Sequence, residues 1–248
     1  MINQILESAA TIEKRKDIKL NVFAIANSKN VLLNKNGVTP NWRNEIQNNG
    51  FSYTIEDVIA YANEHHLENL IAIDNTASAT FVENYIPLIE SSFDLISSNK
   101  VANTLSYSFY KKLRKVLADN QKSYLYETNV AAGLPLIDTI KLLHLSGENI
   151  TKIKGVFSGT LSYLFNNFSA KDVPFSDILK EAIDNGYTEP DPREDLCGND
   201  VGRKLLILAR ELDLQNEFEE IEIQNLIPEH LREGSASEFL TKLKEFDP

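Results

Sequence analysis

The chain has 248 residues, of which 42% are hydrophobic and 25% are charged, so it is long and apolar enough to bury a core and is not a disordered protein. Asp and Glu number 36 against 25 Lys and Arg, and the formal charge of −11 at pH 7 argues against nucleic acid and anionic membranes as partners. The single cysteine, Cys197, excludes an internal disulfide, and no apolar run approaches the roughly 18 residues that span a bilayer.

In the first half of the chain, helical patterns alternate with short apolar runs, which is typical of a mainly parallel sheet covered by helices. Four predicted helices each precede a predicted strand. The helices span 2–15, 54–66, 79–90 and 104–119, and the strands span 18–25, 70–74, 93–97 and 123–127. Such a sheet normally opens with a strand and a glycine-rich turn, but this chain starts in a helical pattern and holds no G-x-G-x-x-G motif. The opening strand is therefore predicted to be absent.

A second domain is predicted to begin at residue 128, where the pattern changes. It combines a strand over 150–157 with helices over 136–145, 160–168, 175–185, 199–212 and 237–246. A weak alternation also runs through 221–227. A polar, proline-rich loop at 186–198 separates two of these helices.

The loop at 186–198 is rich in carboxylates, including Glu189 and Asp195, and two prolines restrict its backbone. Asp200 opens the following helix and Lys204 lies four residues further on, so both side chains project from one face. The simplest interpretation is a surface ion pair at a helix N-terminus. The alternative is that the apolar run after Lys204 buries the helix and turns this lysine toward a cleft, where it can act in proton transfer.

Polar side chains follow three of the predicted strands, at 26–29, 74–78 and 97–100. Ligands bind along the carboxyl edge of a parallel sheet, although turn and capping chemistry explains each segment equally well. If a dinucleotide binds there, Asn27, Ser28 and Lys29 offer polar groups and a cation in place of an acid. That composition favours a 2′-phosphate, and so NADP over NAD.

The segment 127–135 joins the two halves, and its Gly133 and Pro135 predict a hinge. Alternatively, Glu127 and nearby main-chain carbonyls face a hard cation, which prefers oxygen ligands. No pair of histidines has the spacing of a transition-metal site, and Cys197 has no motif partner. Because the first residues carry no secretory signal, the expected location is the reducing cytoplasm.

Five segments together carry a resemblance to a known family. They are 74–78, 98–100, 126–135, 155–163 and 186–204, of which the last, GYTEPDPREDLCGNDVGRK, is the most specific. These segments resemble homoserine dehydrogenase, and in particular the dehydrogenase half of bifunctional aspartokinase/homoserine dehydrogenases.

The resemblance implies an α/β fold, with an incomplete Rossmann-like parallel-sheet domain over 1–127 and an α+β substrate and dimerisation domain over 128–248. It implies an NAD(P)-dependent oxidoreductase that transfers a hydride reversibly between aspartate 4-semialdehyde and homoserine, in threonine and methionine biosynthesis. The expected partners are a small amino-acid substrate and, in the full-length protein, further copies of the chain in a dimer or tetramer.

The resemblance also implies roles for single residues. Lys204 matches the proton donor and acceptor at the substrate hydroxyl, and Glu189 and Asp200 match residues that hold the substrate, particularly its ammonium group. Asp195 matches a further acid of the catalytic cleft. The residue at the junction of cofactor and substrate corresponds to Lys100, and a residue that contacts the nicotinamide cofactor corresponds to Thr76. A monovalent cation, usually sodium, is implied at Glu127 and the carbonyls of Val130, Ala132 and Leu134.

Two features of the family are not found in the sequence. Its first strand and glycine-rich phosphate loop would lie before Met1, and its C-terminal segment would lie after Pro248. Because the amides of that loop form the main cradle for the pyrophosphate, we expect this chain to bind NADP poorly and to turn over slowly or not at all. The alternatives are a non-catalytic fragment or interaction subunit that keeps the fold, and an oxidoreductase that acts on another small semialdehyde.

Overall fold

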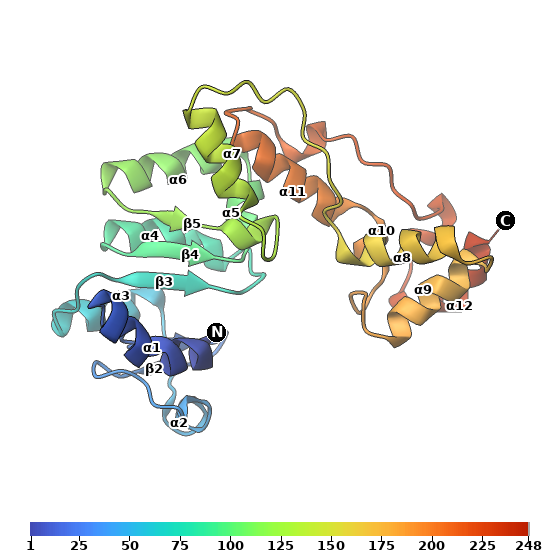
Figure 1. Cartoon of the computed structure of the whole chain (residues 1–248). Helices are drawn as coiled ribbons and strands as arrows, with labels where there is room; N and C mark the ends of the chain where they lie inside the picture. Colours follow the sequence, from blue (N-terminus) through green and yellow to red (C-terminus); the bar gives the residue numbers. More distant parts are fainter. Residues whose placement is uncertain (248) are drawn as a thin grey trace. The chain divides into compact units, whose positions relative to one another are not determined.

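In the computed structural model, which describes residues 1–247, the strands form two separate sheets (Figure 1). One sheet contains β3 (Ile71–Asp74), β4 (Asp94–Ser97) and β5 (Tyr124–Leu125), in that order. Asp94 donates its N–H to the Leu70 carbonyl (2.8 Å) and Ser98 donates its N–H to the Asp74 carbonyl (3.0 Å). The offset between donor and acceptor is the same in both bonds, so β3 and β4 are parallel. The parallel sheet predicted for these three segments is therefore confirmed, with shorter strands than the sequence suggested.

The other sheet is a hairpin of β1 (Ala24–Ala26) and β2 (Val31–Leu33), which pair antiparallel. The prediction that residues 18–25 belong to the parallel sheet is therefore wrong within residues 1–247. The chain reverses after β1 because the side-chain oxygen of Asn27 accepts the N–H groups of Lys29 (2.8 Å) and Asn30 (2.9 Å). This turn closes the hairpin, so residues 26–29 lie between two antiparallel strands and not at the carboxyl end of a strand of the parallel sheet.

The described chain divides into two compact units, and the parallel sheet contributes to both. The first unit comprises Met1–Ala72, Glu83–Leu95 and Val116–Ser123. The second comprises Ile73–Val82, Ile96–Lys115 and the chain from Tyr124 onward. The carboxyl ends of β3, β4 and β5 thus belong to the same unit as the C-terminal helices.

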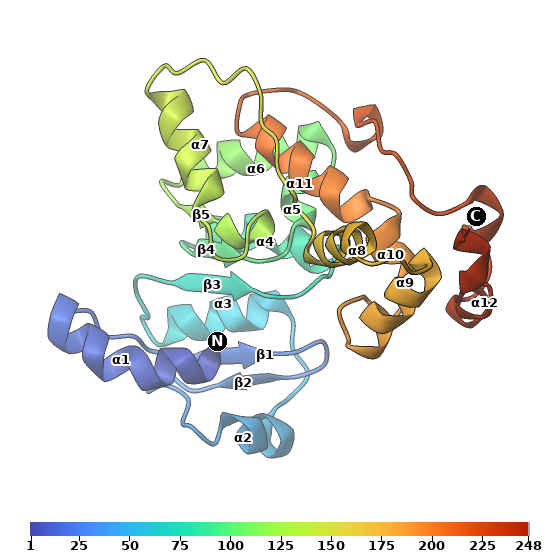
Figure 2. The same ribbon diagram turned by 45° about the vertical axis from the view of Figure 1, so that its right-hand side comes forward.

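A core of the first unit lies between the hairpin and two helices, α1 (Ile2–Lys16) and α2 (Trp42–Asn49). Figure 2 shows the N-terminal end of α1 beside the hairpin, and Ile2 and Leu6 of this helix pack against the buried cluster that includes Ile25 and Leu32. The unit also contains α3 (Ile55–Glu64). Helix α3 begins at a capping box, because Thr54 and Asp57 satisfy each other's backbone N–H groups. Helix α2 and strand β2 have no counterpart among the predicted elements.

Between β3 and β5 the chain is largely helical. A 3-10 turn, η1 (Phe81–Asn84), runs into α4 (Tyr85–Glu90) where one helix over 79–90 was predicted. After β4 come α5 (Val101–Thr104) and α6 (Tyr107–Asp119), and β5 is followed by the 3-10 turn η2 (Glu127–Asn129). Lys100 lies between the end of β4 and the start of α5, so it is at the carboxyl edge of the parallel sheet.

The rest of the second unit consists of helices and loops. The helices are α7 (Leu136–Leu145), α8 (Gly159–Ala170), α9 (Phe175–Asp184), α10 (Arg193–Leu196), α11 (Asn199–Arg210) and α12 (Ala236–Thr241), with 3-10 turns η3 (Phe218–Glu220), η4 (Glu229–Leu231) and η5 (Leu243–Phe246). Apolar side chains from α8, α9, α10 and α12 form one core, in which Leu164, Leu179 and Leu196 are fully buried. Each such side chain contributes roughly 1.5–3 kcal/mol to folding.

The strand predicted over 150–157 is wrong, because these residues form a loop and residues 126–247 contain no strand. A strand needs a hydrogen-bonded neighbour, and no described segment pairs with this one. Val156 in the loop is 75% exposed. The weak alternation over 221–227 likewise forms no strand. No helix within residues 1–247 is long and apolar enough to cross a bilayer.

Candidate active site

The second unit brings one carboxylate between two lysines at the start of α11. Lys204 Nζ lies 2.6 Å from Asp200 Oδ2, one helical turn away, and Lys100 Nζ lies 3.4 Å from Asp200 Oδ1. Helix α11 starts here because Gly198 adopts φ 80°, a left-handed conformation that favours glycine. A β-carbon at this position would also come within 2.8 Å of the Ile223 side chain. The turn at Gly198 therefore sets the position of Asp200.

Lys204 is held inside the protein and is not an ordinary surface lysine. Its side chain is 14% exposed, and Nζ donates to the Phe157 carbonyl (2.6 Å) in addition to Asp200. The ion pair that the spacing predicted is present, and its lysine end is largely buried, as the apolar run after Lys204 predicted. An ammonium group has three N–H donors, and the third has no partner within residues 1–247. Lys204 can therefore donate one hydrogen bond to a substrate oxygen.

Asp200 is ionised at neutral pH because of these neighbours. Burial alone would raise the pKa of Asp200, but the hydrogen bond from Lys204 and the charge of Lys100 outweigh it and lower this pKa below its ordinary value. The Asp200 side chain is 45% exposed, so part of the carboxylate remains accessible to a ligand. A carboxylate with this exposure and two cationic neighbours can hold a polar ligand beside the largely buried ammonium group of Lys204.

The loop before α10 forms a second acidic group. Asp195 Oδ2 accepts the backbone N–H of Glu189 (2.8 Å), while the Glu189 side chain is exposed. Direct bonds thus join Lys100, Asp200 and Lys204 into one cluster and Glu189 and Asp195 into another. The structure records no direct bond between the two clusters within residues 1–247.

The carboxyl ends of β3 and β4 are tied together by side chains. Buried Asp74 accepts a hydrogen bond from Asn99 Nδ2 (3.0 Å) through one oxygen and from the Thr76 N–H (2.7 Å) through the other. Asn99 also donates to the Ser78 carbonyl (3.0 Å). Two of the three predicted polar strand ends therefore meet, and Lys100 directly follows this network. Asn99, which does most of the joining, was not singled out from the sequence.

The remaining predicted strand end, with Asn27, Ser28 and Lys29, lies in the first unit at the turn of the β1–β2 hairpin. The Asn27 side chain already accepts two backbone N–H groups, whereas Ser28 and Lys29 are exposed. A hydroxyl and an ammonium group on an exposed turn fit a phosphate. Thr76 is exposed as well, and its hydroxyl accepts the Ser78 N–H (3.1 Å).

Glu127 caps a helix. Its two carboxylate oxygens accept the N–H groups of Ile137 (2.8 Å) and Asp138 (3.0 Å) at the start of α7. The Leu134 carbonyl accepts the Leu136 N–H (2.8 Å), while Val130 is buried and Ala132 is exposed. Because a carboxylate offers about four acceptor positions, these bonds leave room for a cation. Within residues 1–247, no three His, Cys, Asp or Glu side chains gather to hold a metal ion.

Two arginines that were not predicted as site residues hold the elements of the site together. Arg193 anchors the acidic loop through Asp191. Arg210, at the end of α11, has a fully buried side chain that donates to the carbonyls of Asn103 (2.9 Å) and Leu105 (2.8 Å), in the last turn of α5 and directly after it. Helix α11 is thus held to the α5 segment at both ends, by Asp200 with Lys100 and by Arg210. The only sequence signal for this contact was the position of Arg210 at the end of an apolar helical run, where a charged residue is buried only if it is paired.

Comparison with known proteins assigns this architecture. The family model described as "Homoserine dehydrogenase, NAD binding domain" matches residues 1–127, and the model described as "Homoserine dehydrogenase" matches residues 135–247. The chain is 40% identical to a bifunctional aspartokinase/homoserine dehydrogenase of Buchnera aphidicola over its whole length, which is 30% of that protein. It is 35% identical to the homoserine dehydrogenase of Schizosaccharomyces pombe, again over the whole chain and 68% of the relative.

Solved structures share this fold. A Candida auris protein of unknown function is 31% identical, with a TM-score of 0.83 over 97% of this chain and 70% of that one. A hyperthermophilic archaeal homoserine dehydrogenase in complex with NADPH shares the fold, with a TM-score of 0.64 at 22% identity over 82% of this chain and 64% of that one.

The fold and the matched domains define a protein with an NAD-binding, Rossmann-like domain. The chain belongs to the homoserine dehydrogenase family. It spans about 30% of the length of the bifunctional relatives that it matches.

Proposed function

We propose that this protein interconverts aspartate 4-semialdehyde and homoserine, a step toward threonine and methionine. In the reducing direction, the aldehyde carbon gains a hydride and the aldehyde oxygen gains a proton, so a C–H bond and an O–H bond form. NADPH supplies the hydride when it is bound. The observation that carries the proposal is the buried Lys204, which is held beside Asp200 and has one N–H left to donate.

Lys204 is the proton donor of the reducing direction. The bonds to the Asp200 carboxylate and the Phe157 carbonyl fix the position of Nζ. In the oxidising direction, the neutral amine accepts the proton of the substrate hydroxyl. Lys100 contributes a second positive charge, which stabilises the negative charge that develops on the aldehyde oxygen.

The acidic side chains hold the ammonium group of the substrate. Asp200 is ionised and about half exposed, and the exposed Glu189 offers a second anion. Two anions suit an amino-acid substrate, whereas an uncharged aldehyde gains nothing from them. Asp195 supports this pair through its bond to the Glu189 backbone.

The cofactor is NADP in this proposal, with NAD as the alternative. Ser28 and Lys29 fit the 2′-phosphate, because both are exposed at one turn and one is a cation. Thr76 and Lys100 contact the nicotinamide end. The archaeal homoserine dehydrogenase that shares the fold was solved with NADPH.

Three further assignments belong to the proposal. A sodium ion binds at Glu127 with the carbonyls of Val130, Ala132 and Leu134. The protein assembles with copies of itself as a dimer or tetramer, and it acts in the cytoplasm. The ion site and the assembly rest on the family resemblance of the sequence.

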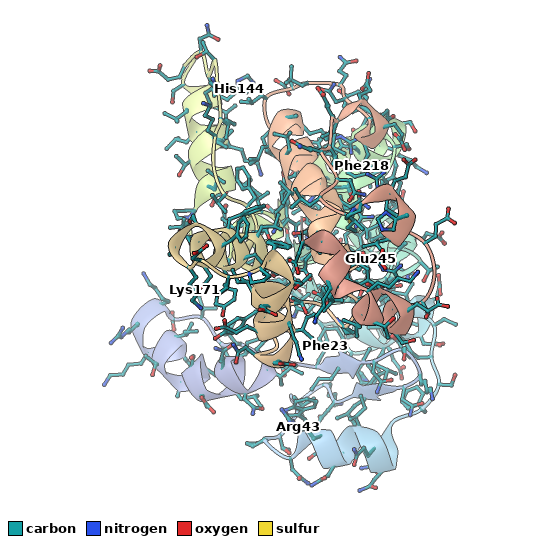
Figure 3. The ribbon with its side chains drawn as sticks, turned by 90° about the vertical axis from the view of Figure 1, so that its right-hand side faces the viewer. Phe23, Arg43, His144, Lys171, Phe218 and Glu245 are labelled. Atoms are coloured by element: carbon teal, nitrogen blue, oxygen red, sulfur yellow. The ribbon has the colours of Figure 1, made fainter. Side chains whose placement is uncertain are left out.

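The decisive experiment compares the wild-type protein with two variants, all expressed from the complete natural reading frame. Wild-type protein is expected to oxidise homoserine with NADP⁺, and Lys204→Ala to lose at least about a hundredfold in turnover while NADPH fluorescence enhancement persists. Lys171→Ala is the control, because Lys171, which Figure 3 labels, forms an exposed ion pair with Glu181, and its loss should leave turnover unchanged. Wild-type protein that binds NADPH but never oxidises homoserine would refute the proposed reaction. Unchanged turnover of Lys204→Ala would remove Lys204 from it.

A further inference from the structure

Arg193 connects the acidic loop to a distant part of the chain. Its Nε donates to Asp191 Oδ1 (2.9 Å) and its Nη2 donates to Asp191 Oδ2 (2.6 Å), a two-pronged ion pair. The remaining donors reach the backbone carbonyls of Arg232 (3.3 Å), Glu233 (3.2 Å) and Gly234 (3.0 Å). The Arg193 side chain is 13% exposed. One guanidinium group therefore ties the loop at 186–198 to residues 232–234.

This contact fixes the backbone around Asp191. The hydrogen bond from the Arg193 side chain lowers the pKa of Asp191, which therefore stays ionised and paired at neutral pH. Asp191 also accepts the backbone N–H of Arg193 (3.1 Å), and its carbonyl accepts the Glu194 N–H (3.0 Å). Pro190 and Pro192 restrict the residues on either side. The loop entering α10 therefore has little conformational freedom.

The restraint extends from Arg193 to Glu189. Arg193 is the first residue of α10, and Asp195 on the same turn accepts the Glu189 N–H (2.8 Å). The Glu189 carboxylate itself has no bonded partner within residues 1–247. The position of the Glu189 carboxylate therefore depends on the Glu189 backbone. That backbone is held by Asp195 of α10, and α10 is held by Arg193.

We propose that Arg193 is a positioning residue for Glu189, and that it acts by clamping the acidic loop to residues 232–234. This inference rests on the proposed function, in which Glu189 receives the substrate ammonium. Arginine is required because its planar fork reaches both Asp191 oxygens and the carbonyls at once. A lysine supplies a single point charge that cannot span them.

The test compares Arg193→Lys with wild type and with Lys171→Gln, which alters an exposed ion pair of the same unit. Arg193→Lys is expected to raise the KM for homoserine about tenfold, with kcat within about twofold and the KM for NADP⁺ unchanged. In a Glu189→Gln background, the same substitution should add nothing further, because both changes act through one carboxylate. Thermal melts verify that each variant is folded, and Asp191→Asn, which breaks the same clamp, replaces Arg193→Lys if the latter does not fold.

An unchanged KM, or an equal rise in KM in the Glu189→Gln background, overturns the proposal, because a merely structural effect would be additive. Amide hydrogen exchange provides a readout that needs no activity. If the wild-type protein does not oxidise homoserine, the proposed function fails, while faster exchange of the Glu189 amide in Arg193→Lys still supports the clamp. Unchanged exchange at this amide overturns it.

Discussion

Substitution of Arg210 by methionine tests the idea that a buried cation holds α11 in place. The Arg210 side chain is fully buried and donates to the carbonyls of Asn103, Leu105 and Asn216, and to the Glu217 carboxylate (3.2 Å). Methionine fills much of the same volume but leaves three carbonyls without a donor. The Asn103 carbonyl is buried and those of Leu105 and Asn216 are part-buried, so each unmet acceptor costs about 1 kcal/mol, whereas Glu217 is partly exposed and recovers its hydration. We therefore expect a loss of about 3 kcal/mol in the free energy of unfolding.

Urea unfolding followed by far-UV circular dichroism measures this loss. With a denaturant slope of about 2 kcal/mol/M, the unfolding midpoint of Arg210→Met should fall by about 1.5 M. Arg203→Met is the matched control on the same helix, because Arg203 is exposed and its guanidinium lies 5.7 Å from the Phe218 ring. This control should lose no more than about 1 kcal/mol. Equal midpoints for the two variants would refute the reasoning.

Three other predictions follow from single contacts. Lys100→Met removes one of the two cations that lower the pKa of Asp200, so this pKa should rise. The stabilisation from ionised Asp200 is lost as the pH falls through its folded-state pKa, and in the variant the low-pH limb of turnover should move to higher pH in a pH–rate profile. Glu127→Ala removes the cap of α7 and should cost about 1 kcal/mol in thermal melts; if the carboxylate also binds sodium, replacing choline by sodium should raise the Tm of wild type but not of this variant. Gly198→Ala should cost about 1–2 kcal/mol, because alanine is strained at φ 80° and meets Ile223, and unaltered urea unfolding would contradict this.

Local sequence pattern identified most helices because their signals lie within a few residues of one another. Helix α7 was predicted with the bounds that it has, Leu136–Leu145, and α9 and α11 end within two residues of their predicted ends. The i, i+4 spacing of Asp200 and Lys204 likewise required only helical geometry, and the two side chains do form an ion pair.

Strand pairing could not be read in the same way. Residues 18–25 and 150–157 both have apolar, strand-like composition, yet one ends in a hairpin and the other is a loop. A strand is stable only when another segment supplies hydrogen bonds, and that partner can lie anywhere in the chain. For residues 24–26 the partner is 31–33, which was not predicted, and for 150–157 no described residues provide one.

The sequence by itself determined most of the longer helices, the acidic loop and the family to which the chain belongs. The tertiary structure decided which of these residues act together. Phe157 supplies the carbonyl that holds Lys204, Asn99 joins two strand ends, and residues 232–234 receive Arg193. Each of these contacts joins side chains to atoms that are between 21 and 47 residues away along the chain. Their formation depends on how the core packs, because burial brings such groups within bonding distance and makes an unmet hydrogen bond costly.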